Sequence, residues 1–314
     1  MTAAPTMLAL AQEYLAFRRT LGFALGSLGK EVLLFARYAD RTGHCGPLTT
    51  ELMVRWAMLT PRARPAYWAW RLHAVRVFAQ HRALDDPQTE VPAPGFLGPT
   101  FRRGHPHIYS SDEVAALLGA ARTLRRRLRP YTCVALFGLL ASTGLRVGEA
   151  LALRRTHVDL DTGLLTIIKS KAGTSRLVPL HASTTEALRE YAATRDRMQA
   201  PPRSDAFFVT ERGTALTYQR VTGTFRTLRR QLGWPTPFGG AAPRVHDLRH
   251  TFAVRVLLQW YERGAEIDAH IATLATYLGH VNVTYTYWYL TAVPELMAIS
   301  AGRFEAYADH GGRR

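Results

Sequence analysis

The sequence predicts a mainly α-helical protein with a small antiparallel β-sheet, made of an all-helical amino-terminal domain and a second domain that mixes helices with that sheet. Three observations carry this prediction. Apolar residues recur at helical spacing throughout residues 5–83. The pattern changes to that of a β-hairpin at residues 164–180. A chain of 314 residues, 47% of them hydrophobic, is long enough to form two cores.

The amino-terminal domain, residues 1–90, is expected to consist of helices throughout. Thr49 and Thr50 are N-cap candidates for one helix, which contains Trp56, and another helix spans Trp70 to Phe78. The apolar positions that define the two preceding helices are Leu8, Ala11, Leu15 and Phe17, and then Leu33, Leu34, Ala36 and Tyr38.

A linker is expected at residues 91–107. The helical pattern fails from Asp85 to Pro106, where five prolines and three glycines interrupt it. The second domain then occupies residues 108–314.

The second domain is expected to open with two helices. Ser110 and Glu113 have the spacing of a capping box, which marks a helix start. Pro130 is placed to begin an apolar helix that runs through Leu140, and Gly144 is placed to end it.

Residues 164–180 have the pattern of a β-hairpin. The first strand contains Leu165, Ile167 and Ile168, residues 172–174 form the turn, and residues 176–180 return. Lys169 and Lys171 therefore fall at the tip of the hairpin.

Two further helices and a short strand are expected after the hairpin. Ser183 and Glu186 form a second capping box, for a helix through Met198. Residues 207–209 have the composition of a short strand. The helix that follows is basic and carries Arg220, Arg226, Arg229 and Arg230.

The charge of the chain indicates a polyanionic partner. The formal net charge is +16 and the isoelectric point about 10.5. Residues 1–108 carry 13 Lys and Arg against 7 Asp and Glu, and residues 109–314 carry 27 against 17, so both parts could contact phosphates. An arginine-rich solvated surface is the alternative. The same two interpretations apply to a basic set in the fourth helix: Arg71, His73, Arg76 and Arg82.

Lysine is rare in this chain, which makes each lysine informative. Only Lys30, Lys169 and Lys171 are lysines among the 40 cationic side chains. An amine can be tuned to release a proton and arginine cannot, so a lysine in an arginine-rich chain is a candidate acid. Chance codon use is the alternative, and we prefer it for Lys30.

The remaining composition predicts a cytoplasmic protein. Cys45 and Cys133 are far apart and match no disulfide framework or zinc-binding spacing. The longest apolar run, residues 133–141, is much shorter than the roughly 20 residues that a membrane span needs. The chain does not open with a signal-peptide pattern.

Four short polar motifs interrupt the apolar helices of the second domain. They are Thr-Gly-Leu-Arg-Val-Gly-Glu at 143–149, His-Asp-Leu-Arg-His at 246–250, Leu-Gly-His at 278–280 and Tyr-Thr-Tyr-Trp-Tyr at 285–289. Each motif alone has an ordinary structural explanation. Arg146 could form an ion pair with Glu149, His280 could be a core histidine, and the tyrosines could be packing residues.

A zinc site at the second motif is disfavoured. His246 and His250 are four residues apart, as zinc ligands on a helix often are. Arg249 lies between them in sequence and would repel a metal cation. The glutamate that serves as the base of a metalloprotease is missing there.

Together, the motifs resemble those of the tyrosine recombinases, the phage-integrase family. The elements of the family pattern occur in order: an arginine after Thr-Gly-Leu, a hairpin lysine, His-x-x-Arg, Leu-Gly-His, and a tyrosine nine residues after the last histidine. The resemblance covers residues 108–293 well and the amino-terminal helices in outline. It implies a helical core-binding (SAM-like) domain that clamps DNA, and a mixed α/β catalytic domain.

The resemblance implies a role for each site residue. Arg146 and Arg249 would clamp the scissile phosphate, Tyr289 would attack it to form a 3′-phosphotyrosine, and Lys171 would protonate the departing 5′ oxygen. His246 would be a general base or a hydrogen-bond donor to the phosphate, and His280 a second donor. The sequence leaves the division between these two histidines open.

The resemblance also implies partners and alternatives. The partner would be double-stranded DNA, bound by a homo-oligomer that forms a tetrameric synapse, and the reaction would need no cofactor, metal or ATP. A type IB-like topoisomerase and a catalytically inactive DNA-binding relative remain alternatives. A terminal apolar stripe would dock on the neighbouring protomer or pack on its own domain: Leu296, Met297, Ile299 and Phe304.

Overall fold

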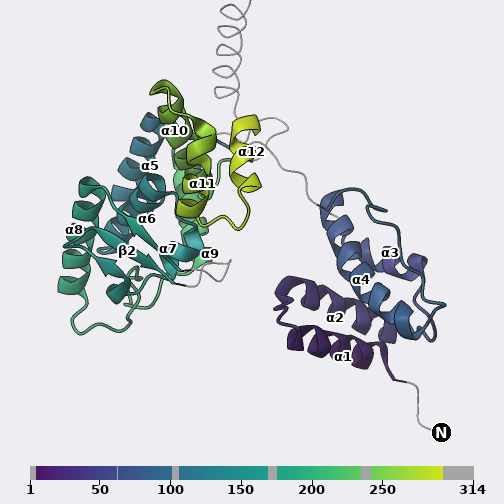
Figure 1. Cartoon of the computed structure of the whole chain (residues 1–314). Coiled ribbons are helices and arrows are strands. Elements are labelled where there is room, and N and C mark those ends of the chain that lie inside the picture. Colours follow the sequence, from purple (N-terminus) through teal and green to yellow (C-terminus); the bar gives the residue numbers. More distant parts are fainter. Residues whose placement is uncertain (1–4, 62, 101–105, 169–174, 235–241, 293–314) are drawn as a thin grey trace, which may run out of the picture. The chain divides into compact units, whose positions relative to one another are not determined.

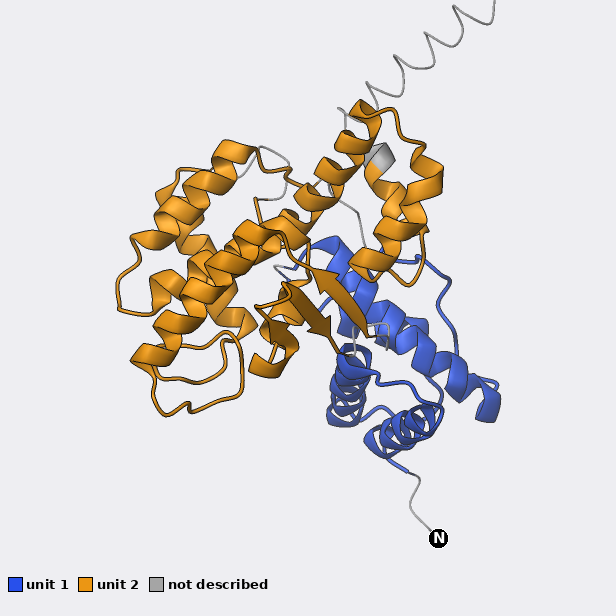
Figure 2. Ribbon diagram, turned by 60° about the vertical axis from the view of Figure 1, so that its left-hand side comes forward, with its two compact units in different colours: residues 1–103 blue, residues 104–314 orange. Residues whose placement is uncertain are grey.

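The computed structural model describes residues 5–61, 63–100, 106–168, 175–234 and 242–292. The chain divides into two compact units, residues 1–103 and residues 104–314 (Figure 2). The division falls inside the segment 91–107 that the sequence predicts as a linker. The start of that segment contacts unit 1, because Arg76 Nε donates a hydrogen bond to the carbonyl oxygen of Pro92 at 2.8 Å. None of the described helices has both the length and the apolar character needed to span a bilayer.

Unit 1 contains helices and no strand among its described residues (Figure 1). The helices are α1 (Met7–Thr20), α2 (Gly26–Arg41), α3 (Thr50–Ala57) and α4 (Pro65–Asp85). The Thr49 side chain caps α3 by accepting a hydrogen bond from Leu52 N, as predicted. Phe35 and Trp56 pack edge to face in the core, with ring centroids 5.4 Å apart. The all-helical prediction is confirmed.

Two residues assigned to the apolar faces of these helices lie at the surface. Phe17 is 49% exposed and Leu34 is 37% exposed. The helical repeat places both beside the buried stripe, whose members on α1 include Ala11 and Leu15. Phe17 instead stacks on His81 of α4, with ring centroids 5.7 Å apart.

Arg71 is a core residue of unit 1 and does not line a groove. Its Nε donates to Glu31 Oε2 at 3.2 Å, and both side chains are buried. Its Nη1 donates to Ala57 O and to Thr60 Oγ1, each at 2.9 Å, and its guanidinium lies 3.9 Å from the ring centroid of Trp56. One arginine thereby joins α2, α3 and α4.

Unit 2 mixes helices with one three-stranded sheet (Figure 1). Its elements are α5 (Ser111–Arg122), α6 (Arg129–Thr143), α7 (Val147–Leu151), the 3₁₀ helix η1 (Arg155–His157), β1 (Val158–Asp159), β2 (Leu164–Ile167), β3 (Arg176–Pro179), α8 (Ala182–Met198), α9 (Tyr218–Gln231), α10 (Asp247–Glu262), α11 (Ile267–Leu278) and α12 (Thr284–Ala292). The predicted fold class is confirmed. The predicted capping box at the start of α5 is also present, since Ser110 and Glu113 exchange both hydrogen bonds.

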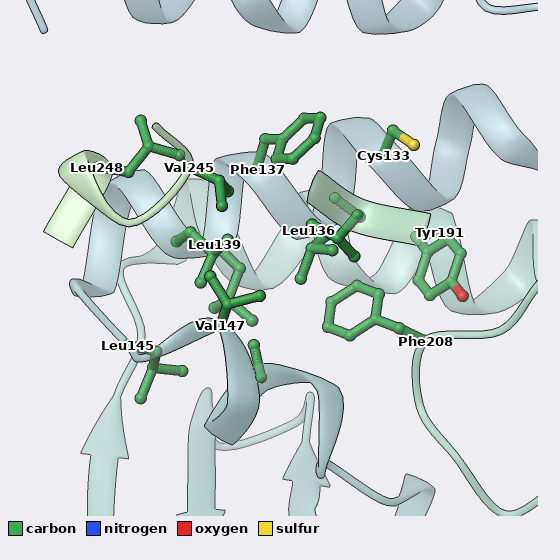
Figure 3. Close-up of a cluster of buried hydrophobic side chains, with 14 of the residues drawn as sticks. Cys133, Leu136, Phe137, Leu139, Leu145, Val147, Tyr191, Phe208, Val245 and Leu248 are labelled. Carbon is green, nitrogen blue, oxygen red and sulfur yellow. The ribbon is translucent and has the colours of Figure 1, made fainter. Parts of the chain in front are cut away.

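Helix α6 forms the centre of unit 2. It is apolar on nearly all sides, as a helix that is covered by neighbours must be. Helices α5, α7, α8 and α10 all pack against it. Figure 3 shows Leu136, Phe137 and Leu139 of α6 among side chains from the other elements, including Val147 and Leu248. The ends of α6 are therefore fixed in place.

The predicted hairpin is present, and a third strand extends it. Strand β2 pairs antiparallel with β3, so that Leu164 faces Pro179 and Ile167 faces Arg176. The short strand β1, which the sequence did not reveal, pairs with the other edge of β2. The expected turn with Lys169 and Lys171 lies outside the described residues.

Two local predictions after the hairpin are wrong. His181, and not Ser183, is the N-cap of α8, and its side chain accepts a hydrogen bond from Ser183 N. Residues 207–209 form no regular strand: Val209 makes an isolated antiparallel bridge with Ala215, and side chains bind several of the other backbone groups. The Tyr191 hydroxyl donates to Phe207 O at 3.2 Å and accepts from Val209 N at 3.1 Å. Arg195 also donates to Phe207 O.

We expect Arg71→Ala to destabilise the protein by about 3–5 kcal/mol, because it leaves the buried Glu31 carboxylate without its partner. Urea denaturation of the full chain, followed by tryptophan fluorescence, measures this change. Trp56 lies against Arg71 and reports on unit 1.

The matched control is Arg55→Ala, which breaks an exposed pair between Arg55 and Glu51 one helical turn apart. Such pairs contribute about 0.3–0.5 kcal/mol. Equal losses for the two variants would show that the buried ion pair does not hold the three helices together.

Candidate active site

The carboxyl end of α11 gathers three arginines from three different parts of unit 2. Three consecutive carbonyl oxygens there each accept a hydrogen bond from one guanidinium group. The pairs are Arg176 Nε with Tyr277 O at 2.8 Å, Arg249 Nη2 with Leu278 O at 2.7 Å, and Arg146 Nη2 with Gly279 O at 2.8 Å. The arginines come from β3, from α10 and from the residue before α7.

This arrangement follows from how a helix ends. The last four carbonyls of an α-helix have no partner within the helix, and the helix dipole places negative charge there. Gly279 ends α11 in the left-handed conformation, with φ of 68°. A β-carbon at this position would lie 2.7 Å from an Arg176 nitrogen. Glycine in the Leu-Gly-His motif is therefore what lets the arginines approach.

Glu149 joins two of the three arginines. Its carboxylate accepts from Arg146 Nη1 at 2.8 Å, and from Arg176 Nη1 and Nη2 at 3.1 and 2.9 Å. Burial opposes ionisation of this carboxyl, but the hydrogen bonds from Arg176 and Arg146 outweigh it, so the pKa of Glu149 is lowered. The ion pair that the sequence allowed for Arg146 exists.

Arg249 is buried and is held from two helix ends. Besides Leu278 O, its Nη1 donates to the carbonyl oxygen of Gly144 at 2.8 Å. Gly144 ends α6 in the left-handed conformation, as its position in the sequence predicted. Burial, and then the charge of Arg146, lower the pKa of Arg249 to about 10, so the group stays cationic at neutral pH. The Arg146 side chain keeps 26% of its surface exposed.

Three histidines lie beside these arginines, and the cationic form of each is disfavoured. Burial, followed by the charge of Arg249, lowers the pKa of His246 and lowers that of His280 to about 4. The pKa of His250 falls to about 3, from burial and then from His246. His280 Nδ1 lies 2.8 Å from Thr286 Oγ1. All three imidazoles are therefore neutral at neutral pH.

The three tyrosines of the fourth motif have different surroundings. Tyr289 is 2% exposed, and its hydroxyl lies 3.1 Å from His250 Nδ1. Its ring stacks on that of His280 with centroids 6.4 Å apart. Tyr285 and Tyr287 are exposed, and the Tyr287 hydroxyl donates to Asp268 at 3.1 Å. The ring of Tyr285 meets that of His280 edge to face, with centroids 6.2 Å apart, but Tyr289 is the buried tyrosine of the three, and its hydroxyl contacts a histidine.

The structure brings most of the predicted site residues into one continuous set of contacts. Arg146, Arg249 and His280 meet at the end of α11, and Tyr289 packs against His280. His246 is connected to this set through His250, because the ring centroids of the two histidines are 5.1 Å apart. The sixth predicted residue, Lys171, lies outside the described residues.

Sequence reasoning missed two members of the set, Arg176 and His250. The sequence pattern places Arg176 in a strand, and no spacing rule relates it to Tyr277, 101 residues later, which precedes the Leu-Gly-His motif. His250 was considered only as a zinc ligand. Its place one helical turn after His246 was the available signal, because residues four apart share a helix face.

The cluster is suited to binding an anion. Three guanidinium groups against the single Glu149 carboxylate leave an excess of two positive charges, 3 − 1 = 2. Arginine donors match phosphate oxygens in geometry. Within the described residues, no three His, Cys, Asp or Glu side chains gather as a metal site.

Comparison with known proteins identifies the family of this chain. Residues 108–295 match the model of the "Phage integrase family". The chain is 43% identical to "Putative integrase/recombinase y4rB" of Sinorhizobium fredii, over 94% of this chain and 95% of that one. It is 27% identical to "Tyrosine recombinase XerC" of Chlamydia trachomatis, over 69% of this chain and 64% of that one.

Two solved structures show the similarity of the fold. The Tn1549 transposon integrase, in complex with transposon right end DNA, has a TM-score of 0.70 at 16% identity, covering 97% of this chain and 100% of that one. The XerH site-specific recombinase, bound to its palindromic difH substrate, has a TM-score of 0.59 at 19% identity, covering 88% and 78%. At such identities the likeness concerns the fold. The family match and the 43% identical relative show that this chain belongs to the phage integrase family of tyrosine recombinases.

Proposed function

We propose that this recombinase cuts and rejoins double-stranded DNA at specific sites through a 3′-phosphotyrosine intermediate, without metal or ATP. The observation that carries the proposal is the convergence of Arg146, Arg249 and Arg176 on one helix end, with the Tyr289 phenol beside them. A nucleophile next to a fixed excess of positive charge is what phosphodiester transfer needs.

Arg146 and Arg249 clamp the scissile phosphate. A phosphodiester enters with one negative charge and gains a second as the attacking oxygen adds, so a site with an excess of two positive charges favours the transition state. The hydrogen bonds to Gly144, Leu278 and Gly279 hold both guanidinium groups before the DNA arrives. Arg176 acts on the clamp indirectly, through Glu149.

Tyr289 attacks the phosphorus, and the histidines assist as neutral imidazoles. The Nδ1 atom of His280 is hydrogen-bonded to Thr286 Oγ1. In the tautomer with hydrogen on Nε2, Nδ1 accepts this bond, and Nε2 can donate to a phosphate oxygen. His246 is proposed as a second donor to the same phosphate. Lys171 supplies the proton to the leaving 5′ oxygen.

Double-stranded DNA is the proposed partner, bound by both domains of a homo-oligomer that forms a tetrameric synapse. The net charge of +16 supports contacts with many phosphates. The Tn1549 integrase and XerH were both solved as DNA complexes. Residues 1–90 and the catalytic domain would together clamp the DNA. The cytoplasm, where such DNA is accessible, is the proposed location.

We expect Tyr289→Phe to abolish the covalent protein–DNA adduct while DNA binding stays nearly unchanged, because the change removes only the attacking oxygen. Adduct formation is measured on denaturing gels, with duplexes that contain the DNA flanking the protein's own coding sequence. Tyr285→Phe is the matched control, because Tyr285 is exposed. An adduct that survives in Tyr289→Phe and is lost in Tyr285→Phe would move the nucleophile to Tyr285.

The general acid is tested with a DNA substrate whose scissile 5′ oxygen is replaced by sulfur. A thiolate leaves without a proton, so sulfur should restore most of the cleavage that Lys171→Ala loses. Arg146→Ala should stay about 100-fold or more impaired on the same substrate, because charge neutralisation is still missing.

The control for the hairpin is Lys169→Ala, which removes the other lysine of the predicted tip. Sulfur rescue of Lys169→Ala, without rescue of Lys171→Ala, would identify Lys169 as the acid. If sulfur restores cleavage in neither variant, the result would contradict a lysine of this hairpin as the general acid.

A further inference from the structure

The hydroxyl of Tyr289 lies against a histidine that the family pattern did not assign. His250 Nδ1 is 3.1 Å from the phenolic oxygen, and the two rings are 5.5 Å apart. The Nδ1 atom of His280 is already bound to Thr286 Oγ1. The ring of His246 packs edge to face on His250. His250 is thus placed between His246 and the nucleophile.

We propose that His250 accepts the phenolic proton of Tyr289 as the tyrosine attacks DNA, an inference that rests on the function proposed above. The bond between the Tyr289 oxygen and phosphorus forms while the bond from phosphorus to the 5′ oxygen breaks. The phenolic proton moves to His250 Nδ1, and the leaving 5′ oxygen takes its proton from Lys171. Rejoining reverses both transfers, so His250 returns the proton to Tyr289.

The surroundings of His250 keep its acceptor atom available. Burial lowers its pKa to about 3, and the further contributors are His246, Arg244, Arg249 and His280. From α12, Tyr289 and Trp288 face it, with the Trp288 ring centroid 5.6 Å away. At neutral pH the imidazole is therefore neutral, and in the tautomer with hydrogen on Nε2 its Nδ1 accepts the phenolic hydrogen.

Binding of DNA should make the neutral His250 imidazole a stronger base. The imidazolium is disfavoured partly by the charges of Arg249 and Arg244. A phosphate held by Arg146 and Arg249 brings negative charge beside them and offsets this repulsion. A bound phosphate thereby reduces the arginine part of the penalty on the His250 imidazolium, whereas the larger part, which comes from burial, remains.

The contact itself is tested without DNA, by nitrogen-15 NMR of histidine-labelled protein. We expect His250 to carry its hydrogen on Nε2 at neutral pH and to stay neutral when the pH is lowered to about 4, because its pKa is about 3. Tyr289→Phe should shift the Nδ1 signal, because it removes the hydrogen-bond donor. A His250 that carries its hydrogen on Nδ1 would overturn the inference.

The proton transfer is tested with His250→Asn, whose amide oxygen can accept a hydrogen bond but cannot take the proton. Adduct formation on a nicked duplex of the flanking DNA should slow by about 100-fold or more. A ring-fluorinated tyrosine at position 289 ionises more readily, so introducing it into His250→Asn should restore much of the rate. A purely structural role of His250 would not respond to the fluorine.

The matched control is His246→Asn with the same fluorinated tyrosine. Rescue of His246→Asn but not of His250→Asn would make His246 the base and overturn the inference. Adduct formation that becomes faster in His250→Asn would also overturn it, because His250 would then only restrain the tyrosine. If the wild-type protein forms no adduct, the proposed function itself fails. That outcome can be distinguished from the two results that overturn only the role of His250.

Discussion

The structure of the site depends on the carboxyl end of α11, where three successive carbonyl oxygens bind three guanidinium groups. Arginines repel one another, so they gather only where negative charge holds them. The helix terminus supplies partial negative charge and unpaired acceptors, and Glu149 supplies one full charge between Arg146 and Arg176. The ends of two helices and one strand are thus tied to a single point, which fixes the positions of the three arginines.

This constraint explains why glycine ends both helices at the site. Gly144 and Gly279 adopt left-handed conformations, in which their carbonyls face Arg249 and Arg146. A β-carbon on Gly144 would lie 2.5 Å from the Phe252 ring, and one on Gly279 would collide with Arg176. Burial, and after it the neighbouring charged groups, lowers the pKa of His250 to about 3 and that of His280 to about 4. At neutral pH these two imidazoles are therefore neutral hydrogen-bonding groups.

The sequence was most informative where a local rule decides the outcome. The capping box at Ser110, the glycine stop at Gly144 and the hairpin pattern depend on residues a few positions apart, and the structure has all three. The sequence was least informative where residues far apart in the chain determine the local structure. The sequence pattern is compatible with Arg71 at the surface, but in the structure Arg71 is buried and hydrogen-bonded to Glu31, 40 residues away. Residues 207–209 have the composition of a strand, but only an isolated bridge forms at Val209, and Tyr191 and Arg195 bind the carbonyl oxygen of Phe207. Family motifs located the arginines and Tyr289, whereas the contact of His250 with Tyr289 required the fold.

The central claim is that the end of α11 holds Arg146 and Arg249 ready for one phosphate. The most direct measurement is a crystal structure of the Tyr289→Phe variant bound to its DNA substrate. The account predicts that both guanidinium groups contact non-bridging oxygens of the same phosphate and keep their hydrogen bonds to Leu278 O and Gly279 O. A complex in which either arginine leaves its carbonyl to reach the DNA, or in which the two bind different phosphates, would contradict it.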